Sequence, residues 1–181
     1  MNLYRIIRIH FRPWTPREMM CFSVVFIIAV TVMYILLHRK KILRFQAVAG
    51  ILMIIYLGVI FASTVFTRMP ESERLYQLNF FWSWREVFFH GNKKLLEENL
   101  LNLLLLFPVG SFLPPLFCKK FSLWSGFLAG TVVSAGIELC QLVFYRGLFE
   151  WDNMVHNGIG CMVGCMISGT VLEYRKKRKN F

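Results

Sequence analysis

An apolar segment at residues 123–144 carries polar side chains that could do chemistry. Ser134, Glu138 and Gln141 are three or four residues apart, so on a helix they share one face. A carboxylate at the centre of a membrane helix costs about 2.5–3.5 kcal/mol on insertion scales, and such groups often mark relays or ligand sites. It must be protonated, paired or hydrated, and Arg146 is the nearest candidate partner. The alternative interpretation of Glu138 and Gln141 is an interhelical polar lock, that is, a set of hydrogen bonds that only holds neighbouring helices together.

Two amides and an acidic loop are expected at the level of Glu138. Asn102 and Asn157 fall near the corresponding ends of two further apolar segments. We therefore predict a functional polar cluster of Asn102, Glu138, Gln141, Asp152 and Asn157, supported by Arg146 and Glu150 from the loop. For the two asparagines alone, an interhelical lock remains the alternative, because amides hydrogen-bond across membrane helices.

Small residues repeat every four positions on the two segments that carry this cluster. One stripe holds Gly126, Gly130 and Ser134, and the other holds Gly160 and Gly164. Small side chains let membrane helices approach closely. We predict that the two stripes pack against each other and bring Glu138 and Gln141 toward Asn157.

The composition indicates that these segments cross a membrane. The chain of 181 residues is 56% hydrophobic and 17% charged, whereas a soluble domain would be about 25% charged. Apolar blocks of about 20 residues match the length that a helix needs to span a bilayer. We predict an all-α, polytopic membrane protein that forms a single domain over residues 1–181. About five spans are expected, at residues 19–37, 47–66, 99–117, 123–144 and 154–172.

The polar flanks of these spans are interpreted as membrane-surface segments. Residues 1–18 alternate arginine with apolar side chains, which predicts an interfacial segment. Residues 67–98 mix charges with many aromatic side chains, which predicts an interfacial aromatic loop. The net charge of +11 comes from short basic runs beside the spans, so we expect lipid head groups and not nucleic acid as partners. The basic residues on the two sides of the membrane are nearly equal in number. Those on the side of the C-terminus are packed beside the span ends, which favours a cytoplasmic C-terminus and an N-terminus outside.

No cofactor or metal site is predicted. Cys161 and Cys165 share a helix face, but no histidine or second cysteine pair completes a zinc site. Pro108 and Gly110 interrupt the third span, and a proline there predicts a kink.

Three stretches together resemble the VanZ-like family of membrane proteins over residues 77–168. They are Asn102 followed by Pro108-Val-Gly110, then Glu138-Leu-Cys-Gln141, then an acidic loop leading to Asn157-Gly-Ile-Gly160. Glu150 stands where the family usually has Asp, and Asn153 stands where a second Asp is common, so a cation-binding loop would carry less charge here. The resemblance implies a role in the bacterial cell envelope, associated with resistance to teicoplanin, without a defined reaction.

Four functions remain open at this point. A VanZ-like protein in the bacterial cytoplasmic membrane would lower susceptibility to teicoplanin-type glycopeptides, with an outward-facing cluster that engages a lipid-linked envelope precursor or the glycopeptide. An intramembrane enzyme would act on a lipid head group, with Glu138 as general base and Asp152 as its partner or a metal ligand. A small proton-coupled transporter would use Glu138 as the proton carrier. A plain membrane scaffold would use the cluster only for packing.

Overall fold

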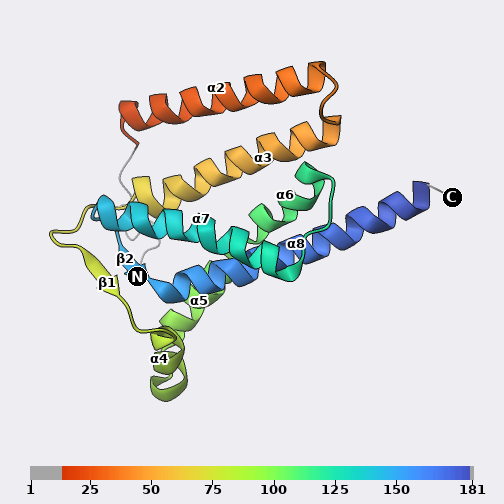
Figure 1. Ribbon diagram of the computed structural model, residues 1–181. Coiled ribbons are helices and arrows are strands. Elements are labelled where there is room, and N and C mark those ends of the chain that lie inside the picture. Colours follow the sequence, from red (N-terminus) through yellow and green to blue (C-terminus); the bar gives the residue numbers. More distant parts are fainter. Residues whose placement is uncertain (1–13, 180–181) are drawn as a thin grey trace.

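The computed structural model describes residues 14–179, which form a bundle of long helices with a small two-stranded sheet at one end (Figure 1). Its helices are α2 (Pro16–His38), α3 (Arg44–Phe61), α4 (Trp82–His90), α5 (Lys93–Leu105), α6 (Phe107–Phe117), α7 (Leu123–Val143) and α8 (Trp151–Lys179), with a π-helical turn, η1 (Ala62–Phe66), after α3. The strands are β1 (Leu75–Gln77) and β2 (Leu148–Glu150). Most of the predicted interfacial segment 1–18 lies outside the described residues.

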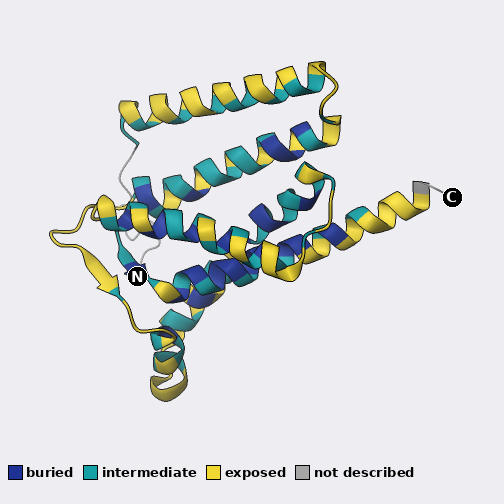
Figure 2. Cartoon of the chain, viewed as in Figure 1, coloured by how far each residue is buried: buried dark blue, intermediate teal, exposed yellow. Residues whose placement is uncertain are grey.

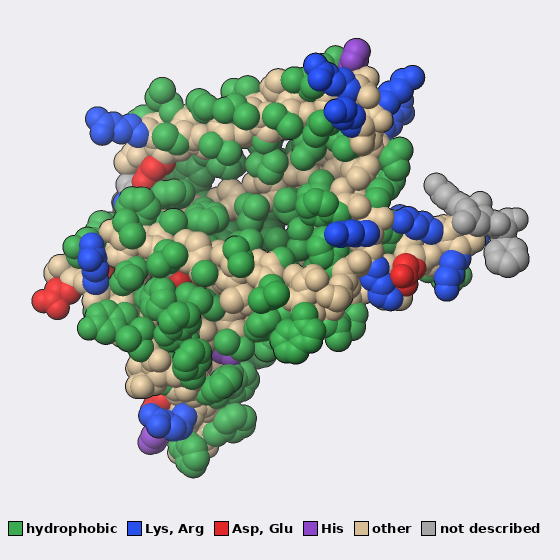
Figure 3. All heavy atoms as spheres, in the orientation of Figure 1, with side chains coloured by type: hydrophobic (Ala, Val, Ile, Leu, Met, Phe, Trp, Pro, Cys, Tyr) green, Lys and Arg blue, Asp and Glu red, His purple; other side chains and the backbone are tan. Residues whose placement is uncertain are grey.

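Five stretches of helix are long and apolar enough to cross a membrane, which confirms the predicted all-α, multi-pass architecture. They are Pro16–His38, Arg44–Phe66, Lys93–Phe117, Leu123–Val143 and Trp151–Arg178. Large apolar side chains cover the outside of the bundle (Figure 3), including Trp124, Leu128 and Val132 on one face of α7. Such a surface suits contact with lipid tails, so the protein is an integral membrane protein.

The third span is broken where the sequence predicts a kink. Helix α5 ends at Leu105, α6 begins at Phe107, and Leu106 between them has a non-helical backbone. Pro108 lies in the first turn of α6, where its missing N–H costs no hydrogen bond. The hydroxyl of Tyr56 donates to the carbonyl oxygen of Leu105 at 3.0 Å and satisfies an acceptor that the break leaves free.

Helix α8 is the centre of the bundle, and its first half is the most buried part of the long helices (Figure 2). It packs on α7 on one side and on α5 and α6 on the other. The predicted packing of one glycine stripe on the other is wrong. The atoms nearest to a Cβ added at Gly126 or Gly130 of α7 include side-chain atoms of Cys165 and Cys161 of α8, and neither Gly160 nor Gly164 is among them.

The second stripe, Gly160 and Gly164, faces the broken span instead. A Cβ added at Gly160 would overlap the carbonyl oxygen of Leu103, and one at Gly164 would overlap that of Phe107. Successive helix positions differ by about 100°, so Cys161 and Gly160 face different neighbours. Both sides of α8 therefore use small side chains for close packing.

The predicted aromatic loop at 67–98 is more structured than the sequence indicates. It contains β1, all of α4 and the first residues of α5. Strand β1 pairs in parallel with β2, and Tyr76 lies opposite Phe149. This small sheet ties the loop to the chain that enters α8. It also fixes the position of Glu150, which belongs to β2.

Acidic side chains are almost confined to one end of the bundle, whereas basic side chains occur at both ends and are densest at the other (Figure 3). Lysines and arginines cluster at the end that holds the α2–α3 turn, the α6–α7 turn and the C-terminal part of α8. Among residues 14–179, Glu173 is the one acidic residue at this end, and it pairs with Lys120 at 3.0 Å. The sheet, α4 and the remaining surface acids lie at the opposite end.

Candidate binding site

A polar cavity of about 350 Å³ opens at the sheet end of the bundle, between α5, α7, β2 and the start of α8. Its polar lining comes from Thr64, Arg68, Trp82, Ser83, Glu98, Asn99, Asn102, Glu138, Gln141, Glu150, Asn153 and Asn157. We call this cavity the amide pocket, because five side-chain amides contribute to it. Four of the five residues predicted for the functional cluster line it, and Asp152 does not.

Glu138 is buried at the base of the amide pocket, with 2% of its surface exposed. Its carboxylate accepts two hydrogen bonds of 3.0 Å, from the backbone N–H of Glu150 and from Nδ2 of Asn153. Within the described part of the chain, no ion pair reaches Glu138. Neutral N–H groups therefore hold the carboxylate, and the sequence-based choice of Arg146 as its partner is wrong.

Asn153 is the centre of the hydrogen-bond network, although the sequence did not single it out for the cluster. Its Nδ2 donates to Glu138 and to Glu150, both at 3.0 Å. Its Oδ1 accepts from Nδ2 of Asn102 at 2.5 Å. Asn102 thus reaches the acid through Asn153. The signal for Asn153 is its place four residues before Asn157, on the same helix face.

The other two amides of the predicted cluster hold neighbouring helices. Gln141 donates from Nε2 to the carbonyl oxygen of Thr64 in η1 at 3.0 Å. Asn157 donates from Nδ2 to Oγ of Ser134 at 2.8 Å, across the α7–α8 contact. These two bonds fit the interhelical locks that the sequence left as an alternative.

Three buried atoms of residues that line the amide pocket have no hydrogen-bond partner among the described residues. They are Nδ2 of Asn99, Oδ1 of Asn157 and the indole Nε1 of Trp82. Asn99 was not predicted, although it precedes Asn102 by three residues and so lies on the same face of α5. An unmade hydrogen bond at a buried group costs about 1–3 kcal/mol, so a pure packing role does not account for these atoms.

Asp152, in the first turn of α8, binds the N-terminus of α4 instead of lining the pocket. One carboxylate oxygen accepts from the backbone N–H of Phe81 at 2.5 Å, and the other accepts from the N–H and Oγ of Ser83 at 3.0 and 2.6 Å. A carboxylate in this position satisfies N–H groups that have no partner within the helix. The interpretation of Asp152 as a member of the cluster, or as the acid–base partner of Glu138, is therefore corrected.

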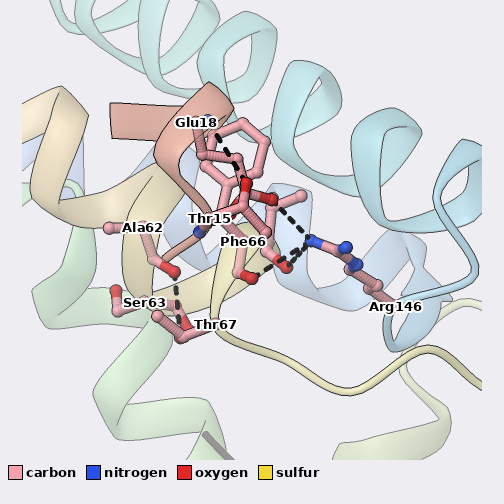
Figure 4. Close-up of polar contacts among 8 residues, drawn as sticks. Thr15, Glu18, Ala62, Ser63, Phe66, Thr67 and Arg146 are labelled. Carbon is pink, nitrogen blue, oxygen red and sulfur yellow. Dashed lines mark hydrogen bonds and ion pairs between the residues drawn. The ribbon is translucent and has the colours of Figure 1, made fainter. Parts of the chain in front are cut away.

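Arg146 also lies outside the amide pocket, where it joins α2 to the turn after α3 (Figure 4). Its Nη1 donates to the carbonyl oxygens of Val65 and Phe66 at 3.3 and 3.1 Å and lies 3.7 Å from Oε1 of Glu18. Glu18 in turn belongs to the capping box that begins α2 at Thr15. The arginine thus links η1 to α2, a helix with no buried residue among Pro16–His38.

Glu150 is half-buried at the wall of the amide pocket. Burial raises the pKa of its carboxyl above the usual 4.5, and the Asp152 and Glu98 carboxylates add to this rise. The N–H groups of Asn153 and Trp82 act in the opposite direction. Because the folded state holds this proton more tightly than the unfolded state, ionised Glu150 lowers stability as pH rises above about 4.5.

Glu150→Gln should therefore raise the thermal midpoint of the purified protein at pH 8. The variant keeps an acceptor oxygen for Asn153 but removes the buried charge. The gain should shrink as pH falls and vanish well below pH 4.5, where wild-type Glu150 is protonated in both states. Thermal unfolding across this pH range measures the effect, and a gain that is independent of pH would contradict it.

Among residues 14–179, no three His, Cys, Asp or Glu side chains converge closely enough to hold a metal ion. The pocket instead offers carboxylates and amides around a space open to solvent. Its chemistry is that of a binding site with many hydrogen-bond donors and acceptors.

A family model described as VanZ/LLP1 matches residues 45–172 of the chain. The match begins in α3, includes every element that lines the amide pocket, and contains the region 77–168 in which the sequence motifs lie. Helix α2 precedes it. No curated protein and no solved structure matches the chain.

Proposed function

Because the chain belongs to the VanZ/LLP1 family, we propose that it is a cell-envelope protein that lowers susceptibility to teicoplanin-type glycopeptide antibiotics through the amide pocket. The observation that carries this proposal is the buried carboxylate of Glu138 beside an open cavity with two unpartnered amide atoms. An interhelical lock uses up its polar groups within the protein. Here donors and acceptors remain available to a ligand, such as a lipid-linked envelope precursor or the glycopeptide.

The pocket must face outward for this function, and the distribution of charge supports that orientation. Basic residues flank the cytoplasmic ends of membrane helices in excess. The dense basic runs lie at the end opposite the amide pocket, around residues 39–44, 119–120 and 175–178. In a bacterial cytoplasmic membrane, this arrangement supports an orientation with the C-terminus in the cytoplasm and the pocket open to the outside.

Expression in a teicoplanin-sensitive host should raise the inhibitory concentration of teicoplanin several-fold, and Glu138→Gln should return it to the empty-vector value. Glutamine keeps the shape of the side chain but removes the charge that Asn153 and the Glu150 N–H hold. Glu173→Gln is the matched control, because Glu173 is half-exposed at the other end of the bundle. It should protect as well as wild type at equal abundance in the membrane.

Two results would overturn this proposal. Wild-type protein that leaves teicoplanin susceptibility unchanged removes the resistance function, and Glu138→Gln that protects fully removes the role of the pocket. The orientation is tested in the same strains with a cysteine-free background. A cysteine introduced at exposed Tyr76 should react with a membrane-impermeant reagent in intact cells, whereas one at Lys176 should not.

A further inference from the structure

The two unpartnered amide atoms of the amide pocket, with the indole N–H of Trp82 as a second donor, define the chemistry of its occupant. Asn99 Nδ2 is a hydrogen-bond donor, and Asn157 Oδ1 is an acceptor. The two side chains are 3% and 2% exposed, so bulk water does not readily serve them. An occupant that satisfies both must accept at one point and donate at another.

Charged groups meet this requirement poorly. A simple anion would accept from Asn99 but would also face the carboxylates of Glu138 and Glu150, which line the same cavity. A simple cation would suit those carboxylates and Asn157, but it would leave the Asn99 N–H without a partner. A hydroxyl group both donates and accepts, so a head group with several hydroxyls fits the whole lining.

The size of the cavity limits this head group. A volume of about 350 Å³ is near the lower end of the range for small-molecule sites, about 300–1,000 Å³. One hydroxylated ring or a glycerol unit fits this range, whereas a long oligosaccharide does not. The pocket thus suits the terminal unit of a larger molecule.

The apolar side of the cavity indicates what the head group is attached to. Leu95, Leu101 and Leu105 of α5 line the pocket together with its asparagines. Leu101 is also 65% exposed on the outer surface of the bundle, where lipid tails contact a spanning helix. The cavity therefore borders the bilayer at α5, and a hydrocarbon chain can lie there while the head group occupies the pocket.

Building on the proposed function, we infer that the amide pocket binds the neutral, polyhydroxylated head group of a membrane glycolipid, which accepts from Asn99, donates to Asn157 and extends its chain over Leu101. Glu138 and Glu150 receive further hydroxyls. Arg68, at the exposed rim, is placed to contact polar groups that join the head to the chain.

The test uses the full chain in phosphatidylcholine nanodiscs and octyl β-glucoside, below its micelle concentration, as the probe. Titration calorimetry, corrected with empty nanodiscs, should show saturable binding. Octyl phosphocholine should bind at least about tenfold more weakly, because it lacks the hydroxyls. Free glucose should also bind at least about tenfold more weakly, because it has no chain for the surface at Leu101.

Asn99→Leu separates binding from folding. The leucine has a similar size, and the Asn99 Nδ2 bonds to nothing in the described structure, so the thermal midpoint should stay the same or rise. Affinity for octyl glucoside should fall about tenfold or more. Asn79→Leu, at an exposed position outside the pocket, is the matched control and should bind as wild type does.

Each of the following results would overturn the inference. They are the absence of saturation above empty nanodiscs, equal binding of octyl phosphocholine, equal binding of free glucose, and undiminished binding by Asn99→Leu. A lower thermal midpoint for Asn99→Leu would show that the Asn99 amide stabilises the fold instead of binding a ligand. Glucoside binding by a protein that gives no teicoplanin protection would sustain this inference and remove the proposed function. Teicoplanin protection without glucoside binding would remove this inference and leave the proposed function in place.

Discussion

Gly160→Ala should destabilise the protein by about 2–3 kcal/mol, because the added methyl group has no space. A Cβ at this position would overlap the carbonyl oxygen of Leu103, a backbone atom that cannot rotate away. Helix α8 would have to move off α5, and the amide pocket lies along this contact. Gly164→Ala should have a similar effect through Phe107.

Gly136→Ala is the matched control for this prediction. Gly136 lies within α7, and a Cβ added there would meet no atom within 4 Å. Alanine favours the helix and restricts the unfolded chain, so this variant should be more stable than wild type by about 0.5–1 kcal/mol. Unfolding of the purified variants in one detergent measures both effects. Equal stability of Gly160→Ala and Gly136→Ala would contradict the packing.

The sequence predicted the helices and much of the amide pocket because both depend on regular spacing. Apolar blocks of bilayer length identify spans whatever their neighbours are. Depth along a span then follows from position alone, since each helical residue advances about 1.5 Å. The spacing predicts one level for Asn102, Glu138, Gln141 and Asn157, and the four side chains line one cavity in the structure.

The pairing of helix faces could not be predicted in the same way. A stripe of small residues shows that some helix approaches closely, but it does not show which one. Gly160 and Gly164 fit the carbonyl groups of the broken span, and the break at Leu106 depends on backbone geometry that spacing does not reveal. The same limit applies to Arg146, because the turn after α7 directs it toward η1 and α2.

The amide of Asn153 changes the charge of the pocket relative to the family pattern. This position commonly carries an aspartate in the family pattern, whereas here an amide donates to both Glu138 and Glu150. An ionised aspartate could only accept, and it would add a third negative charge beside the other two. The amide makes the pocket less suited to a cation and more suited to an uncharged ligand with hydroxyl groups.

Asp152→Ala should release α4 from the bundle and lower stability by about 2–4 kcal/mol. The substitution leaves the N–H groups of Phe81 and Ser83, and Oγ of Ser83, without the acceptor that they share. Ser83 is buried, so water does not easily replace the carboxylate. The hydrogen bond from Trp84 to His156, 2.6 Å long, would then be the main polar contact between α4 and α8.

Hydrogen exchange distinguishes this capping role from a reactive one. In Asp152→Ala, amides across residues 75–90 should exchange much faster than in wild type, while those in the middle of α7 should change little. Ser83→Ala removes only the Oγ bond and should have a smaller effect, about 1 kcal/mol. If Asp152 instead served as a reactive carboxylate, Asp152→Asn would keep wild-type exchange in α4 and lose teicoplanin protection. If Asp152 only caps α4, teicoplanin protection should fall in each variant in proportion to the faster exchange of the α4 amides. The two are linked because Trp82 and Ser83, at the start of α4, line the amide pocket.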